Sequence, residues 1–169
     1  ARIAASTAML NPAPANATVS ADLRAAVDLL TPNETEFASL LLRHVGERVE
    51  AEGVSALDQA RLHAYCRELA PKATVVVTLG ASGCFVSHPA EGARGDESAY
   101  YRIPAEPARA VDTTGAGDAF NGALAASLAQ RQDWAFARHI RFATRYAALS
   151  TERQGAASAM PRIEDMQGG

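Results

Sequence analysis

The sequence predicts an α/β fold, with a mainly parallel sheet flanked by helices. Short apolar runs alternate with longer segments whose apolar residues recur at helical spacing. One apolar run, Val75–Leu79, is continuous and rich in β-branched residues. Such runs are typical of parallel strands that are covered on both faces. The chain has 169 residues, 48% of them hydrophobic, and this is enough for one domain with a real core. We therefore expect residues 1–169 to form one domain.

The first half of the chain is expected to hold two short strands and two helices. Ala8–Leu10 predicts a buried strand, and Val27–Thr31 predicts a second one, because a proline follows each run and stops the ladder. Asn33–Glu36 predicts a helix start, with Asn33 as N-cap and Glu36 at the third helical position. Ser55–Asp58 resembles another capped start. Apolar residues follow both starts at helical spacing: Phe37, Leu40 and Leu41, then Leu62, Tyr65, Cys66 and Leu69.

The second half begins with the strand at Val75–Leu79, which ends at Gly80. Cys84–Val86 predicts a neighbouring strand. The polar, glycine-containing segment 89–97 predicts a loop, and Ala99–Ile103 an edge strand that ends at Pro104. Helices are expected at about Gly117–Gln130 and Trp134–Ser150. Phe120, Leu124 and Leu128 form an apolar stripe on the first of them, and a glycine-rich tail closes the chain.

The composition of the chain and its lack of several motifs exclude some classes of function. The net charge of -3 argues against nucleic acid as a general partner. No apolar run approaches the ~20 residues of a membrane span, and the start at Ala1–Ile3 lacks the apolar core of a signal peptide. We therefore expect a cytoplasmic protein, with Cys66 and Cys84 as free buried thiols. The sequence contains no P-loop and no protein-kinase motif.

The segment Asp112–Asp118 is the most informative stretch of the chain. Two carboxylates bracket a Thr-Thr-Gly-Ala-Gly turn that runs directly into an alanine-rich amphipathic segment. Glycines allow backbone amides to converge at a helix start, where the helix dipole favours an anion. A carboxylate in the same turn can lie beside that anion and take a proton. An anion cradle with its own base is what phosphate transfer to a hydroxyl requires.

The segment from Val111 to Gly122 resembles the C-terminal signature of the ribokinase-like sugar kinases, also called the carbohydrate kinase PfkB family. The resemblance implies a ribokinase-like three-layer fold. It implies that Asp118 is the catalytic base that contacts the sugar hydroxyl, and that Gly115, Ala116 and Gly117 form the anion hole. It also implies that the chain is the nucleotide-binding, C-terminal part of a sugar kinase domain. The sugar-binding N-terminal half and the lid, through which a homodimer would form, would then be absent, and the chain alone would be inactive.

Two further segments resemble nucleotide-binding motifs of that family. Asn33–Glu36 is similar to its NxxE motif, in which Asn33 would contact the nucleotide and Glu36 would act on the Mg²⁺ of Mg-ATP, directly or through water. The same residues are equally compatible with a simple capping box. The other segment is similar to the family's T-L-G-x-x-G pattern at ATP phosphates and ribose, and comprises Thr78, Leu79, Gly80, Ala81, Ser82 and Gly83. An ordinary strand exit is the alternative there. Gly117, Asp118 and Thr144 would complete the nucleotide site.

Asp112 matches a family position that lies beside a monovalent-cation site. The resemblance implies K⁺ as an activator, held by Asp112, Thr114, Ser150, Arg153, Gly155 and Ala159. The family often has serine where this chain has Ala159. The alternative is that Asp112 is a structural acid that accepts backbone amides and holds the turn.

The resemblance implies ATP-dependent phosphorylation of a small sugar. Leu10–Ala15 is more similar to the ribokinase branch than to the fructokinase or adenosine kinase branches, which favours D-ribose and the product D-ribose 5-phosphate. The alternative for this segment is a rigid proline turn that shapes the sheet edge. Another sugar or sugar acid, of the fructose or 2-keto-3-deoxygluconate type, is the first alternative. A nucleotide-binding regulator without catalysis is the second. Dinucleotide binding is disfavoured because Gly115-Ala116-Gly117 lacks a third glycine at the required spacing.

Overall fold

The computed structural model describes residues 6–166, so the start at Ala1–Ile3 and the glycine-rich end lie outside the described residues. The chain forms two compact units. The sheet unit comprises Ala1–Ala93 and Glu97–Arg102, and the helical unit comprises Arg94–Asp96 and Ile103–Gly169. Each unit is described by itself.

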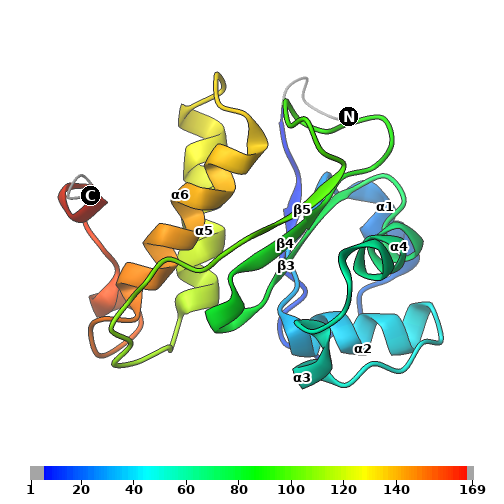
Figure 1. The fold of residues 1–169 in the computed structure, drawn as a ribbon, viewed down its shortest axis with the longest axis horizontal. Helices are drawn as coiled ribbons and strands as arrows, with labels where there is room; N and C mark the ends of the chain where they lie inside the picture. Colours follow the sequence, from blue (N-terminus) through cyan, green and yellow to red (C-terminus); the bar gives the residue numbers. More distant parts are fainter. Residues whose placement is uncertain (1–5, 167–169) are drawn as a thin grey trace. The chain divides into compact units, whose positions relative to one another are not determined.

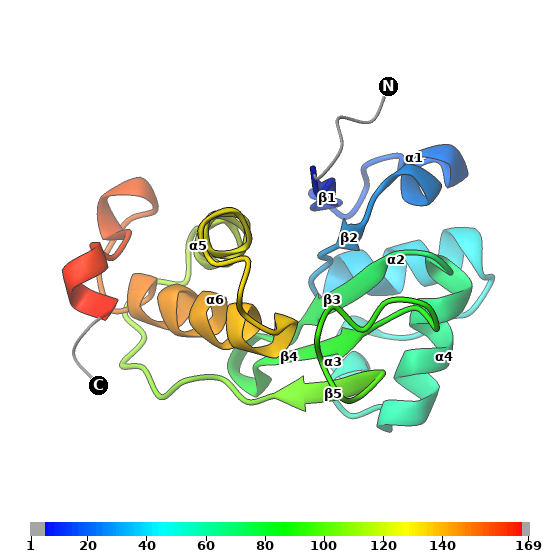
Figure 2. The ribbon, with the colours of Figure 1, turned by 90° about the horizontal axis from the view of Figure 1, so that it is seen from above.

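The sheet contains five strands in the order β1-β2-β3-β4-β5 (Figures 1 and 2). They are β1 (Met9–Leu10), β2 (Leu29–Leu30), β3 (Thr74–Thr78), β4 (Cys84–Ser87) and β5 (Tyr100–Ile103). β2 is parallel to β1 and to β3, whereas β3 and β4 are antiparallel. The predicted α/β class with a mainly parallel sheet is confirmed, and the expected edge strand is β5. β1 is half-buried rather than buried.

Both predicted helices of the sheet unit are present, as α2 (Glu34–His44) and α4 (Gln59–Leu69). Asn33 caps α2, and Asp58 caps α4 by accepting a hydrogen bond from the Arg61 amide. Two short helices, α1 (Ala21–Ala26) and α3 (Ala51–Val54), were not predicted. α1 buries no residue and α3 only Val54, so neither carries the apolar periodicity that marks a helix in sequence.

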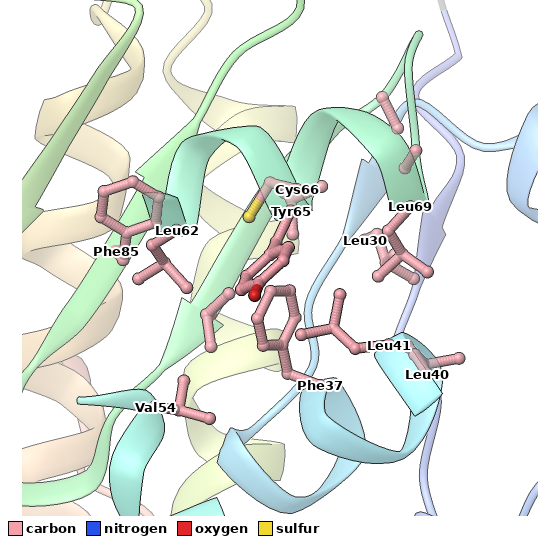
Figure 3. Close-up of a cluster of buried hydrophobic side chains, with 14 of the residues drawn as sticks. Leu30, Phe37, Leu40, Leu41, Val54, Leu62, Tyr65, Cys66, Leu69 and Phe85 are labelled. Carbon is pink, nitrogen blue, oxygen red and sulfur yellow. The ribbon is translucent and has the colours of Figure 1, made fainter. Parts of the chain in front are cut away.

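The core of the sheet unit lies between the sheet and helices α2 and α4 (Figure 3). Every apolar residue predicted for the two helix stripes is buried there: Phe37, Leu40, Leu41, Leu62, Tyr65, Cys66 and Leu69. They pack with Leu30, Val75, Val77 and Phe85 from the strands. Cys66 and Cys84 are both free and buried, as expected, and burial raises the pKa of the Cys66 thiol to about 12.

The helical unit is built on α5 (Ala116–Gln130) and α6 (Phe136–Ser150), which lie side by side (Figure 1). Phe120 and Leu124 of the predicted stripe are buried, and Leu128 is half-buried. α6 begins two residues later than predicted. Asp96 accepts a hydrogen bond from the Ala137 amide (2.8 Å) and so caps the first turn of α6.

Trp134 belongs to the turn before α6. Its ring has two cation–π partners, the guanidinium groups of Arg138 in α6 and of Arg131, at 4.2 Å and 5.7 Å from the ring centroid. Two short 3₁₀ helices follow α6, at Ala157–Ala159 and Ile163–Met166.

Candidate active site

The carboxyl ends of β1, β2 and β3 lie at one edge of the sheet, because the three strands are parallel. Ligands of open α/β sheets bind at this kind of edge. Backbone hydrogen bonds join the segments that leave the strands. The Thr31 amide donates to Leu10 O (2.9 Å), and the Thr78 amide donates to Pro32 O (2.9 Å). The structure thus brings two predicted nucleotide segments, Asn33–Glu36 and Thr78–Gly83, to the same edge of the sheet unit.

Asn33 and Glu36 form a complete capping box at the start of α2. The Asn33 amide donates to Glu36 Oε2 (2.8 Å), and the Glu36 amide donates to Asn33 Oδ1 (2.9 Å). Glu36 is only 5% exposed, and its Oε2 is held in place by the Asn33 amide. The box explains the fixed position of this oxygen, whereas the role of Glu36 toward Mg²⁺ stays a prediction.

Glu34 is an acidic residue at this edge that the sequence did not single out. Its Oε2 lies 3.9 Å from the point where a Cβ atom on Gly80 would stand. Burial, followed by the charge of Glu52, raises the pKa of Glu34. Only its place inside the NxxE-like segment could have indicated it.

The turn after β3 depends on two glycines with positive φ, Gly80 (φ 50°) and Gly83 (φ 87°). It is closed by hydrogen bonds from the Leu79 amide to Gly83 O (2.8 Å) and from the Ser82 amide to Leu79 O (2.8 Å). L-residues rarely adopt positive φ, so this backbone path requires glycine. A tight glycine turn beyond a buried strand allows a phosphate to approach the backbone.

In the helical unit, the Asp112 side chain joins the loop before α5 to the loop after α6 through two hydrogen bonds. Its Oδ1 accepts from the Thr114 amide (2.9 Å) and its Oδ2 accepts from the Gly155 amide (2.9 Å). Hydrogen bonds from the Thr114 side chain, then from the Gly155 and Thr114 amides, lower the pKa of Asp112 to about 2. Asp112 is therefore charged at neutral pH.

The turn at the start of α5 contains the residues that were predicted to form the anion hole. Gly115 is the N-cap, with φ 79°, and no side chain caps the first-turn amides. These amides, from Ala116 to Asp118, lie at the positive end of a helix of 15 residues, and the Ala116 amide also donates to Thr113 O (3.2 Å). Asp118 is exposed in the same turn, so its carboxylate can reach a hydroxyl group. The residues of the predicted anion hole and the predicted base thus lie in one turn, and their roles stay predictions.

The other residues predicted for the K⁺ and adenine sites are either buried or already paired. Ser150 is 2% exposed and donates to Ala147 O (2.7 Å), and Arg153 pairs with Asp165 (3.3 Å). Ala159 is buried in a 3₁₀ turn, and Thr144 is buried on α6. Within residues 6–166, no group of three or more His, Cys, Asp or Glu could hold a metal ion. A cation here would therefore depend on single carboxylates and backbone carbonyls.

Two residues of the helical unit support the turn without any sequence signal. Thr151 O accepts from the Val111 amide (2.7 Å) and from the Asp112 amide (3.0 Å). Ala156 packs so close to Gly115 that a Cβ on Gly115 would lie 3.1 Å from the Ala156 Cβ. A backbone carbonyl and a methyl group leave no chemical mark in a sequence, so only the structure reveals these contacts.

A model of the pfkB family of carbohydrate kinases matches residues 2–163. The chain belongs to this family. Among curated pfkB family relatives, ribokinase of Haemophilus influenzae is 36% identical over 157 residues, which are 93% of this chain and 45% of that protein. Ribokinase of Mus musculus is 34% identical, over 94% of this chain and 44% of that protein. The chain thus spans about half the length of the curated relatives it matches.

Solved structures support the same fold. A ribokinase from Thermotoga maritima matches with a TM-score of 0.73 and 30% identity, over 94% of this chain and 47% of that one. An Arabidopsis thaliana ribokinase, solved with ribose and ATP, gives a TM-score of 0.74 and 25% identity, over 94% and 46% of the two chains. The predicted ribokinase-like fold is confirmed. Among the described residues, no helix has the length and apolar character to cross a bilayer.

The hydrogen bonds that Asp112 accepts from the Thr114 and Gly155 amides make the stability of the folded protein depend on pH. The folded-state pKa, about 2, lies below the ordinary value of 3.8, so stability from this carboxylate is present above about pH 4 and is lost as the pH falls toward 2. We expect the amide resonance of Gly155 to titrate with a midpoint near 2 in NMR spectra, and Asp112→Asn to abolish this step. A midpoint near 3.8 in the unmodified protein would contradict the hydrogen bond between Asp112 and the Gly155 amide.

Proposed function

We propose that the protein that carries this chain transfers the γ-phosphoryl group of ATP to a sugar hydroxyl, with D-ribose as acceptor and D-ribose 5-phosphate as product. The observation that carries the proposal is the Gly115–Asp118 turn, in which uncapped helix amides and an exposed carboxylate stand together. Membership of a carbohydrate kinase family supports the proposal, as does the similarity to ribokinases. In this reading residues 1–169 are the nucleotide-binding and catalytic part of the enzyme.

Asp118 is the proposed general base. Its carboxylate takes the hydroxyl proton, the hydroxyl oxygen forms a bond to the γ-phosphorus, and the bond to the β-phosphate oxygen breaks to release ADP. The amides of Ala116, Gly117 and Asp118 stabilise the negative charge on the migrating phosphoryl group. Losing one such donor costs about 3 kcal/mol in other enzymes, so their placement governs the rate.

The sheet unit would bind the nucleotide and its metal. The glycines of the Thr78–Gly83 turn would let the phosphates approach the backbone, and Asn33 would add a polar contact. Glu36 has an oxygen fixed by the capping box, which fits the oxygen ligands that Mg²⁺ prefers, directly or through water. Bound Mg²⁺ would neutralise charge on the β- and γ-phosphates.

We also propose activation by K⁺. Asp112 is charged at neutral pH and joins the Thr114 and Gly155 backbones, so a cation beside it would hold the loop and the anion turn together. Carbonyls of Thr114 and of the segment containing Ser150, Arg153, Gly155 and Ala159 are the remaining ligands. We expect faster turnover in KCl than in a bulky tetraalkylammonium salt at matched ionic strength. Equal rates in the two salts would remove K⁺ from the site.

The test of the function is a sugar panel with the full-length protein and Mg-ATP. The panel contains D-ribose, 2-deoxy-D-ribose, fructose and 2-keto-3-deoxygluconate, and ADP and sugar phosphate are both measured. Deoxyribose is included because a Salmonella typhi relative named deoxyribokinase is 33% identical over 158 residues. We expect the highest kcat/KM for ribose. A different preferred acceptor would correct the substrate, and ATP binding without transfer to any acceptor would support a regulator.

The proposal places the enzyme in the cytoplasm, with ATP, ADP and a small sugar as its ligands. Neither nucleic acid nor a membrane is a proposed partner. A homodimer formed through the lid is the proposed assembly.

A further inference from the structure

We propose that Asn11 is a positioning residue for the metal-binding side of this reaction. Its side chain ties the loop after β1 to the segment that leads into the Asn33–Glu36 box. The inference rests on the proposed function and deepens it, because it assigns a role to a residue that touches none of the reacting groups.

A side-chain hydrogen bond joins the loop after β1 to the segment that leads into α2. Asn11 Nδ2 donates to Thr31 O (2.9 Å), across 20 residues of sequence. Leu10 O accepts from the Thr31 amide (2.9 Å) and from Thr31 Oγ1 (3.3 Å). Thr31 is only 1% exposed, so its backbone oxygen has little access to water as a substitute partner. Leu10 thus binds the backbone N–H of Thr31 and Asn11 binds its C=O, and only the Asn11 bond depends on a side chain outside Thr31.

Only Pro32 separates Thr31 from the Asn33–Glu36 box, and its ring restricts the backbone between them. Pro32 follows Thr31 with a fixed φ, and Asn33, the N-cap of α2, comes next. Pro32 O also accepts from the Thr78 amide at the end of β3. A shift of Thr31 would therefore move both the Asn33–Glu36 box and the strand end from which the glycine turn begins.

The other end of the loop after β1 is hydrogen-bonded to side chains farther along α2. Ser39 Oγ donates to Ala15 O (2.8 Å), and Arg43 donates to Asn16 O (3.3 Å) and Ala17 O (3.0 Å). The segment 11–17 thus braces the helix at two places, before its first turn through Asn11 and along its length through Ser39 and Arg43. A loop fixed in this way sets the position of the helix start and not only the shape of the sheet edge.

The experiment compares Mg²⁺ titrations of the full-length protein and its variants, at fixed ATP and sugar. Asn11→Asp keeps the side-chain shape but turns the donor into an acceptor that faces Thr31 O, and Asn11→Ala removes it. We expect either change to raise the Mg²⁺ concentration for half-maximal rate by about fivefold, the effect of one lost hydrogen bond. The KM for sugar should stay unchanged. Glu36→Gln, which alters the proposed ligand itself, should raise the Mg²⁺ requirement as well.

Asn16→Ala is the matched control, because Asn16 is exposed in the same loop and offers only its backbone oxygen. It should titrate like the unmodified protein. An unchanged Mg²⁺ titration in Asn11→Asp overturns the proposal. So does a fall in thermal stability without a Mg²⁺ shift, or an equal shift in Asn16→Ala.

A second readout separates this inference from the proposed function. Calorimetric ATP titrations with and without Mg²⁺ require no turnover. We expect the Asn11 variants to lose about fivefold in Mg-ATP affinity and less in the affinity for metal-free ATP, because the Asn33–Glu36 box follows Thr31 almost directly, whereas the glycine turn is linked to it only through the bond from Thr78 to Pro32. If the unmodified protein phosphorylates no sugar, the function fails while this binding comparison still decides the role of Asn11. Equal Mg-ATP affinities in Asn11→Asp and the unmodified protein overturn that role.

Discussion

Asp118→Asn should lower kcat for sugar phosphorylation by about 10²- to 10⁴-fold, the range that general bases supply. The amide has nearly the shape of the carboxylate but cannot take the hydroxyl proton. The side chain is exposed in the first turn of α5, so the fold does not depend on its charge. ATP binding, measured by calorimetry, should survive because both the proposed phosphate-binding turn and the proposed metal ligand belong to the sheet unit.

Asp22→Asn is the matched control for that experiment. Asp22 is also an exposed aspartate in the first turn of a helix, α1 of the sheet unit, and any general effect of removing such a charge should appear there too. We expect its kcat to equal that of the unmodified protein. Near-normal turnover in Asp118→Asn would remove Asp118 from the role of base.

Gly115→Ala should reduce kcat by about 10²-fold or more, because displacing one amide donor of an anion hole has an effect of this size. The residue has a φ of 79°, and left-handed backbone costs other residues about 1–2 kcal/mol. The added methyl group would also lie 3.1 Å from the Ala156 Cβ, so the turn and its supporting loop must move apart. Steady-state kinetics together with thermal unfolding would measure both effects.

Gly46→Ala separates backbone strain from the geometry of the anion turn. Gly46 has a similar φ of 83°, lies in the sheet unit after α2, and has no atom within 4 Å of an added Cβ. It should lose stability through its backbone and keep its activity. A Gly115→Ala protein whose kinetics match those of Gly46→Ala would show that the close contact with Ala156 is irrelevant to catalysis.

The sequence predicted those parts of the structure whose causes are local. Asn33 and Asp58 mark helix starts because an N-cap bonds to an amide only three residues away. Phe37 and Leu62 lie in the core because helical periodicity places them on one face. Gly115 indicated a tight turn just before α5, because a backbone with positive φ favours glycine.

The contacts that position the candidate site could not be predicted in this way. Asp112 meets Gly155 across 43 residues, and Asn11 meets Thr31 across 20 residues, in each case through a backbone atom that every residue type possesses. The resemblance to a family suggested the first pair but not the bond between them. Asp96, which caps the first turn of α6, likewise bonds to Ala137 across 41 residues.

Phosphorus NMR of the full-length protein with ATP, Mg²⁺ and D-ribose tests most directly whether the Gly115–Asp118 turn transfers a phosphoryl group to a sugar hydroxyl. We predict that ADP and a sugar phosphate form in equal amounts, and that neither forms with Asp118→Asn under the same conditions. ATP consumption that yields inorganic phosphate without sugar phosphate would contradict this account. So would sugar phosphate formation that Asp118→Asn leaves unchanged.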